Sequence, residues 1–223
     1  MDQSQRCFEL LQSGDDDGLR RLLDETPGAA EARDAAGVSL LMHALYRSRR
    51  GLAETIADKK HDLDIFEASS LGRRERLQGC LSDATATAIN SFSKDGFTAL
   101  HFACYFGQPG AARLLIEKGA KVDVVAKNAT QVMPLHSAAS SRNLAAARLL
   151  VEHGAPVNAR QQSGWVPIHA AAQNGDPDMV KLLLAYGADA DLANNDGKTS
   201  AMVAREKGHT EIVALLEAVK SKS

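Results

Sequence analysis

A short sequence pattern recurs at a nearly constant interval in the C-terminal half of the chain, and this periodicity limits the fold more than any other feature. The pattern occupies residues 96–103, 132–139, 164–171 and 197–204. One shared position, called here the histidine position, holds in turn His101, His136, His169 and Met202, at steps of 35, 33 and 33 residues. Each histidine is followed 18 residues later by a Gly-Ala pair, at 119–120, 154–155 and 187–188. Repetition at this period predicts structural units that stack on one another.

These residues resemble the ankyrin repeat, which has a period of about 33 residues and the signature Thr-Pro-Leu-His-x-Ala. The resemblance extends to standalone ankyrin proteins of the bacterial type. It implies that each repeat is a helix, a tight turn and an antiparallel second helix, followed by an extended, β-hairpin-like finger. The expected fold is therefore an all-α ankyrin-repeat solenoid. The expected function is to hold a partner protein or peptide, without catalysis.

The same frame extends toward the N-terminus with weaker matches. Phe8, Met42 and Phe66 occupy the histidine position there, which makes seven repeats in all. We therefore expect one ankyrin-repeat domain over residues 1–223, divergent over 1–92 and well matched over 93–220.

Two irregular steps predict departures from the regular repeat. The step from Met42 to Phe66 is only 24 residues, too short for two helices and a finger. We expect the finger between repeats two and three to be missing, with residues 61–64 joining the helices directly. The step of 35 residues places two extra residues in the finger from Val124 to Val132, where Gln131 replaces the usual turn glycine. That finger should have a longer tip of different shape.

The start of each first helix carries recognisable signals. Residues at the N-cap position with a hydroxyl that can accept a backbone N–H are Ser39, Thr98 and Thr199. Pro134 and Pro167 occupy the first helical position, where proline's missing N–H has no cost. Met133 and Val166 replace the capping hydroxyl, and each loss should cost about 1 kcal/mol.

The regularly spaced histidines could suggest a metal site or a general base. The resemblance implies instead that each ring hydrogen-bonds the neighbouring finger, and one stacked repeat separates each histidine from the next. We therefore interpret His101, His136 and His169 as structural, and expect neither a metal nor another cofactor.

The resemblance implies that a partner binds on the concave face, at the finger tips and the last exposed turn of each first helix. The expected partner-binding residues are Tyr46, Arg47, Phe97, Tyr105, Phe106, Val132, Ser140, Ser141, Trp165, Gln173, Asn174 and Lys198. The same two rows include Val38, Ser70, Leu71, Glu206 and Lys207. Five of the ten aromatic residues in the chain lie on these rows, and aromatic side chains dominate binding hot spots. For Phe97 and Phe106, packing between repeats explains the residue equally well.

Two alternative functions involve the N-terminal third. An arginine cluster, consisting of Arg47, Arg49, Arg50, Arg73, Arg74 and Arg76, could bind an anionic partner or nucleic acid, or could be a solvated edge of two turns. An enzyme would need an acid, a base and a nucleophile gathered within residues 1–92, and no such motif is present there.

Composition narrows the partners further. A formal net charge of −2 predicts neither a nucleic-acid partner nor an anionic membrane surface. No apolar run is long enough to span a bilayer, and the polar N-terminal segment lacks a signal-peptide core. The three cysteines have no paired spacing, which favours packing over metal binding. The sequence thus predicts a cytoplasmic protein, and we favour a monomer.

Overall fold

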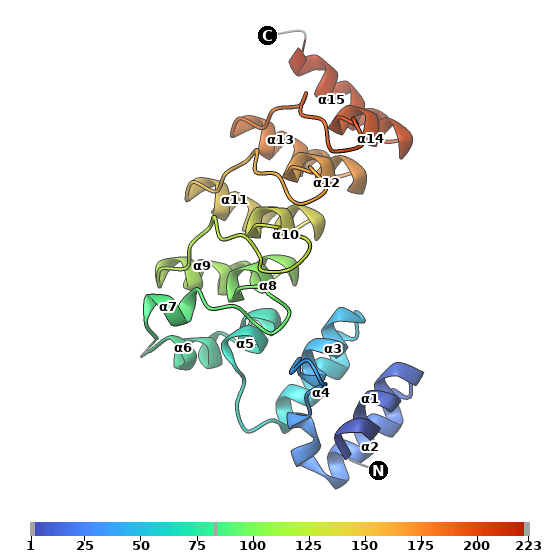
Figure 1. The fold of residues 1–223 in the computed structure, drawn as a ribbon, viewed down its shortest axis with the longest axis vertical. Coiled ribbons are helices and arrows are strands. Elements are labelled where there is room, and N and C mark those ends of the chain that lie inside the picture. Colours follow the sequence, from blue (N-terminus) through green and yellow to red (C-terminus); the bar gives the residue numbers. More distant parts are fainter. Residues whose placement is uncertain (1–2, 83, 221–223) are drawn as a thin grey trace.

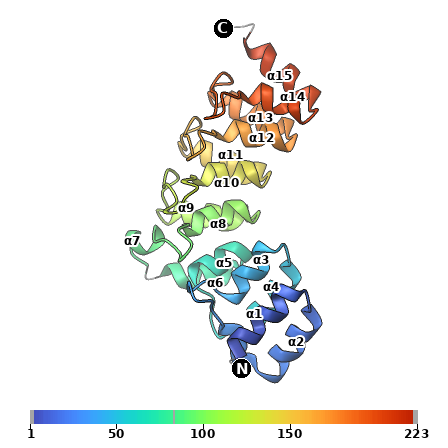
Figure 2. The same cartoon turned by 45° about the vertical axis from the view of Figure 1, so that its right-hand side comes forward.

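The computed structural model describes residues 3–82 and 84–220, which form a stack of helix pairs (Figure 1, Figure 2). The first four pairs are α1 (Gln3–Ser13) with α2 (Asp16–Glu25), α3 (Leu40–Tyr46) with α4 (Arg50–Lys59), α5 (Ile65–Leu71) with α6 (Arg74–Ser82), and α8 (Ala99–Tyr105) with α9 (Pro109–Glu117). The last three pairs are α10 (Pro134–Ser140) with α11 (Leu144–Glu152), α12 (Pro167–Asn174) with α13 (Pro177–Ala185), and α14 (Ser200–Glu206) with α15 (Thr210–Lys220). A 3-10 helix, η1 (Pro27–Glu31), and the short α7 (Ala86–Ile89) lie in connecting segments. The expected seven-repeat, all-α solenoid is confirmed.

The hydrophobic core is a column shared between repeats. First helices α5, α8, α10, α12 and α14 pack each on the next, and second helices pack behind them. Leu100, Leu115, Leu135 and Leu150 are almost completely buried and belong to one apolar cluster that extends along the stack. Each repeat therefore depends on its neighbours for most of its apolar burial, as in other solenoids.

Small residues let the first helices approach one another closely. Ala103, Ala138 and Ala171 are fully buried on this row. A larger side chain at any of them would force the stacked helices apart, because protein interiors have little free volume.

The histidine ring completes the N-terminal turn of its own helix. In repeats four, five and six, the ring Nδ1 accepts the backbone N–H of the N-cap residue, at 3.3, 3.1 and 3.3 Å. This bond is made equally by Thr98, Met133 and Val166, so it does not require a capping hydroxyl. Pro134 and Pro167 begin their helices as expected.

The fingers project to the left of the helices in Figure 2 and are hairpin-like, without extended sheet in the described residues. We number each finger by the repeat that follows it: finger 2 (residues 33–39), finger 4 (91–97), finger 5 (124–132), finger 6 (159–165) and finger 7 (192–198). Single antiparallel bridges close fingers 2 and 7, at Arg33–Ser39 and Ala193–Thr199. Gln131 adopts a left-handed conformation (φ 51°) where other fingers have glycine, and the longer tip of finger 5 is confirmed.

Neighbouring fingers are joined by backbone hydrogen bonds. The N–H of Lys127 in finger 5 donates to Gly96 O in finger 4, at 2.8 Å. The same type of bond joins Gln162 to Thr130 O and Asn195 to Ser163 O, at 3.2 and 3.1 Å. Fingers 4 to 7 therefore form one connected row.

Repeats two and three are joined without a finger, as the short step predicts. Helix α4 ends at Lys59 and α5 begins at Ile65, with Asp64 as its N-cap. Helix α3 does not pack on α5 as closely as α5 packs on α8. Long polar side chains connect the two repeats instead: Arg33 to Asp64, Arg50 to the carbonyl of Leu71, and Arg73 to Asp58, at 3.2, 3.0 and 3.1 Å.

The interface between repeats two and three buries two residues that the sequence placed on the concave face. Ser70 and Leu71 are buried rather than exposed, so the prediction for these two residues is wrong. The physical reason is that repeat two covers the end of α5: Ser70 Oγ lies 3.5 Å from the sulfur of Met42, and Arg50 reaches over Leu71.

Lys60 makes the most deeply buried charged contact between repeats two and three. Its side chain is 1% exposed, and Nζ lies 2.6 Å from Glu31 Oε2 and 3.4 Å from Glu67 Oε1. Glu67 is equally buried, and its pKa is raised by burial and by the charge of Asp64. The carboxylate of Glu67 therefore depends on Lys60 for compensation.

We expect Lys60→Met to lower the free energy of unfolding by about 3 kcal/mol or more at pH 7, because it leaves a buried carboxylate unpaired. Urea unfolding measures the change. Lys59→Met is the matched control, since Lys59 pairs with the exposed Asp24 and should contribute about 1 kcal/mol or less. Equal losses in the two variants would contradict the role assigned to Lys60.

Candidate partner-binding surface

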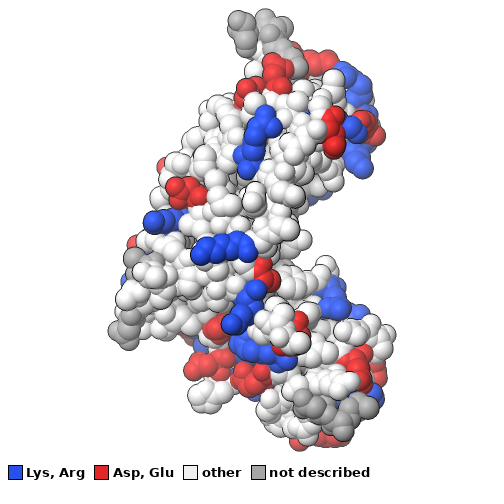
Figure 3. Space-filling model, in the orientation of Figure 1, with Lys and Arg blue, Asp and Glu red and all other residues white. Residues whose placement is uncertain are grey.

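The stack is hollowed along its first helices. In Figure 3 the hollow opens to the right of the view, and its middle part is mostly uncharged. Two cavities lie on this surface, and they bring together seven of the twelve partner-binding residues expected from the sequence.

The first cavity, called here the Tyr105 pocket, measures about 260 Å³. It is lined by Tyr46, Phe97, His101, Phe102, Tyr105 and Ser137. Tyr105 is 50% exposed and Tyr46 is 41% exposed, unusually high for large apolar residues in this chain. The pocket therefore offers a wall of aromatic carbon to solvent.

Tyr46 enters this pocket from a distant repeat. It is the last residue of α3, yet its hydroxyl donates to Asp95 Oδ2 of finger 4, and its ring lies 6.1 Å from that of Phe106. Burial raises the pKa of Tyr46, and the hydrogen bond to Asp95 raises it further. The phenol therefore stays protonated and can donate. Repeats two and four thus share one aromatic cluster.

The second cavity, called here the Trp165 groove, measures about 380 Å³. It is lined by His136, Ser140, Gln161, Trp165, Val166, Ala170, Gln173 and Asn174. Trp165 is half-buried, with its ring 5.6 Å from that of His169. Ser140 and Gln173 are exposed beside it and offer hydrogen-bonding groups.

Asn174 and Ser141 use their side chains to join repeats. The amide of Asn174 donates to Ser140 O at 3.0 Å, and the hydroxyl of Ser141 donates to Cys104 O at 3.1 Å. Both residues therefore support the surface as well as bordering it.

Five expected residues lie outside the two cavities. Phe106 is half-buried against Phe102 and Tyr46, so it packs between repeats. Val132 contributes its carbonyl to His101, Lys198 pairs with Glu206, and Ser141 bonds within the stack. Arg47 is exposed, 3.3 Å from the ring of His43.

Several residues that line the cavities were not among those predicted from the sequence, among them Phe102, Ser137 and Ala170. Each of them directly follows the histidine position and lines one of the two cavities. That regular spacing is the signal that could have identified them.

The histidines of repeats four to six hold the finger row against the helices. Nε2 lies 3.0 Å from Val132 O for His101, 2.9 Å from Ala159 O for His136, and 3.0 Å from Lys198 O for His169. A carbonyl requires a donor, so each Nε2 carries the proton. Burial lowers the pKa of His101 to about 4 and also lowers the pKa of His136 and His169, which keeps the rings neutral. Their structural interpretation is confirmed.

The arginine cluster does not form an unbalanced positive patch. Arg49 pairs with Asp16, Arg50 with Glu54, Arg73 with Asp58 and Arg76 with Asp62. These contacts neutralise most of the charge and connect repeats one, two and three. The geometry therefore does not favour the anionic-partner alternative.

The divergent N-terminal third holds a depression of about 660 Å³ with titratable residues in its wall, including Lys60, Asp64, Glu67 and Cys80. Most of the charged groups already have partners, since Lys60 contacts Glu67, Asp64 contacts Arg33 and Arg76 contacts Asp62. Burial and the charge of Asp64 raise the pKa of the Cys80 thiol, which makes it a poorer nucleophile. This arrangement does not favour the enzyme alternative.

Within the described ranges, no group of three or more His, Cys, Asp or Glu residues is arranged to hold a metal ion. None of the helices in that part of the chain is long and apolar enough to cross a membrane.

Stacked helix pairs with projecting fingers and a hollow along the first helices define a helical repeat solenoid. Comparison with protein families identifies which one. A family model described as ankyrin repeats (3 copies) matches residues 65–161 and 135–221. These matches span more than half of the chain, which therefore belongs to the ankyrin-repeat family.

The buried neutral histidines make stability depend on pH. Because the folded pKa of His101, about 4, lies below its ordinary value of 6.5, protons bind the unfolded state more tightly. We expect the contribution of His101 to be complete above pH 6.5 and to fall by about 3 kcal/mol as the pH drops to 4. Urea unfolding across this range, with NMR titration of the His101 Cε1–H resonance, measures both effects. A resonance that titrates near pH 6.5 would contradict a buried neutral ring.

Proposed function

We propose that this protein binds a partner protein or peptide on its concave face, without catalysis, through the Tyr105 pocket and the Trp165 groove. Ankyrin repeats are generally protein–protein interaction modules, and the chain belongs to that family. The observation that carries the more specific proposal is that Tyr46 and Tyr105, both more than 40% exposed, line the same cavity. Exposed aromatic side chains in a concave site are typical anchors for a partner.

The rigidity of the surrounding structure supports this surface. Apart from Tyr46, the residues that line both cavities lie in repeats four to six, where histidine–carbonyl and finger–finger hydrogen bonds fix the finger tips. A surface that is ordered before binding loses less conformational entropy when the partner arrives. Binding should therefore depend on shape complementarity to a preformed groove.

The neighbouring polar groups add to the proposal. Ser140 and Gln173 lie at the Trp165 groove beside apolar surface, an arrangement that suits a peptide backbone. An apolar side chain of the partner would enter the Tyr105 pocket, while the peptide continues along the groove.

Replacing both Tyr105 and Trp165 with alanine tests this proposal. A partner is first captured from cell lysate with the wild-type protein and purified, and its Kd is measured by calorimetry. We expect the double variant to raise Kd by roughly 30-fold or more, because an aromatic anchor contributes about 2 kcal/mol.

Tyr186→Ala is the matched control. Tyr186 is 41% exposed but caps the end of α13, away from both cavities, so its loss should leave Kd unchanged. Circular dichroism should show that all variants keep their helices. If the control and the double variant weaken binding equally, the concave cavities are not the binding site.

A further inference from the structure

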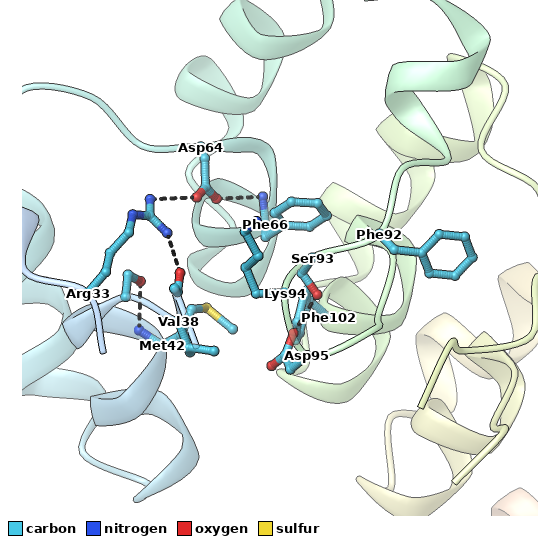
Figure 4. A pocket seen from close by; sticks show the side chains of 12 residues that line it. Arg33, Val38, Met42, Asp64, Phe66, Phe92, Ser93, Lys94, Asp95 and Phe102 are labelled. Carbon is cyan, nitrogen blue, oxygen red and sulfur yellow. Dashed lines mark hydrogen bonds and ion pairs between the residues drawn. The ribbon is translucent and has the colours of Figure 1, made fainter. Parts of the chain in front are cut away.

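The absent finger between repeats two and three leaves a cavity on the finger side of the molecule. The cavity measures about 240 Å³ and lies between finger 2 and finger 4 (Figure 4). We call it the finger gap. Its apolar floor consists of Val38, Met42, Phe66 and Phe102, and its charged residues are Arg33, Asp64, Lys94 and Asp95.

Elsewhere in the row, the backbone of the next finger fills this position. A Cβ placed on Gly96 would lie 2.6 Å from the carbonyl oxygen of Lys127, and one on Gly164 would lie 2.8 Å from the amide nitrogen of Asn195. A Cβ on Gly37 would meet only the flexible side chain of Lys94, with Cγ at 3.2 Å. One lysine side chain therefore lies where a whole finger lies in the other repeats.

The backbone hydrogen bonds also show that no finger occupies the position beside finger 4. In fingers 5, 6 and 7 the donor to the preceding finger is Lys127, Gln162 or Asn195. The equivalent residue of finger 4 is Lys94. In each finger this donor directly follows the residue whose N–H closes the finger, and in finger 4 that residue is Ser93, which donates to Phe97 O. Within the described residues, the Lys94 N–H has no backbone acceptor. Finger 4 thus presents a donor at the position where fingers 5 to 7 are bonded.

The charges around the gap leave one cation without an ion pair. Arg33 contacts Asp64 at 3.2 Å, as Figure 4 shows, and also donates to Gly37 O. Asp95 accepts from the hydroxyls of Tyr46 and Ser93. Lys94 makes no ion pair with any residue that the structure describes. The four formal charges balance, but among the described residues the Lys94 ammonium is the one charged group of the gap without a polar side-chain contact, and so it is available to a partner's carboxylate.

The floor of the gap differs chemically from the floor beneath the other fingers. Met42 stands at the histidine position of repeat two, so no imidazole is available to donate to an incoming carbonyl. Phe66 and Phe102 form an edge-to-face pair beside it, with ring centroids 6.0 Å apart. An apolar cavity of about 150 Å³ can hold a benzene ring, so 240 Å³ suffices for a leucine or phenylalanine side chain.

We propose that the finger gap binds an extended segment of a partner protein that carries a bulky apolar residue beside an acidic one. The apolar side chain enters between Met42, Phe66 and Phe102. The carboxylate pairs with Lys94 Nζ, and a backbone carbonyl of the segment accepts the Lys94 N–H. The partner segment would then take the place of the missing finger, at a site that adjoins the Tyr105 pocket at Phe102 but is not lined by Tyr105 or Trp165.

A displayed library of random 12-residue peptides provides the probe. Peptides that bind the full-length Lys94→Glu variant are first removed, and the remaining library is selected on the wild-type protein. The affinity of each selected peptide is then measured by fluorescence anisotropy. We expect the selected peptides to share an aliphatic or aromatic residue next to Asp or Glu. Lys94→Glu should weaken their binding by about tenfold or more and Lys94→Gln by less, while added salt should weaken wild-type binding.

Two further variants locate the binding. Lys127→Glu makes the same charge change on the adjacent finger and should leave peptide affinity within about twofold, which is well below one tenfold step. The Tyr105→Ala/Trp165→Ala variant should also bind the peptides with unchanged affinity. This result is expected whether or not the concave face binds a partner. Selected peptides should shift the methyl NMR signals of Val38 and Met42.

Several results would overturn the proposal. These are a library with no enriched peptide, enriched peptides without an acidic residue, or affinity that is unchanged by Lys94→Glu. Loss of peptide binding in the Tyr105→Ala/Trp165→Ala variant would also overturn it, because the peptides would then bind the concave cavities.

Discussion

Repeats four to seven are held together by buried, neutral imidazole rings, and the proposed binding surface depends on them. Each ring accepts an N–H from its own helix start through Nδ1 and lies against a carbonyl of the next finger through Nε2. One side chain thereby fixes a helix and a finger at the same time. Burial keeps the ring neutral, which is the state that can both accept and donate. The cavities over these repeats are therefore ordered before any partner binds.

Where this contact is lacking, the molecule is built differently. Met42 holds the histidine position of repeat two, and no finger follows it. Arginine and lysine side chains connect repeats two and three across the resulting interface, and Tyr46 reaches past repeat three to finger 4. The same irregularity therefore produces the finger gap and brings a tyrosine into the Tyr105 pocket. Removing one partner of such a buried ionic contact is costly, because the other charge is left unpaired.

Features that depend on local spacing could be predicted from the sequence. The 24-residue step revealed the missing finger, and the 35-residue step together with Gln131 revealed the longer tip. Features that depend on how distant repeats face one another could not be predicted from the sequence. Tyr46 and Asp95 are 49 residues apart, and their contact depends on where the end of α3 places the Tyr46 side chain relative to finger 4. The arginine cluster was visible as charge, but its acidic partners, among them Asp16 and Asp58, became apparent only once the helices were placed.

Native-state hydrogen exchange tests most directly whether the missing finger divides the stack into parts of different stability. The amides of α3 and of α10 are compared, since α10 lies between two histidine-linked repeats while α3 faces the interface that lacks a finger. We expect α3 to exchange through a partial opening of lower free energy, while α10 is protected up to global unfolding. Equal opening free energies for the two helices would show that the missing finger does not weaken the stack, and would contradict the role assigned to the histidine-linked fingers.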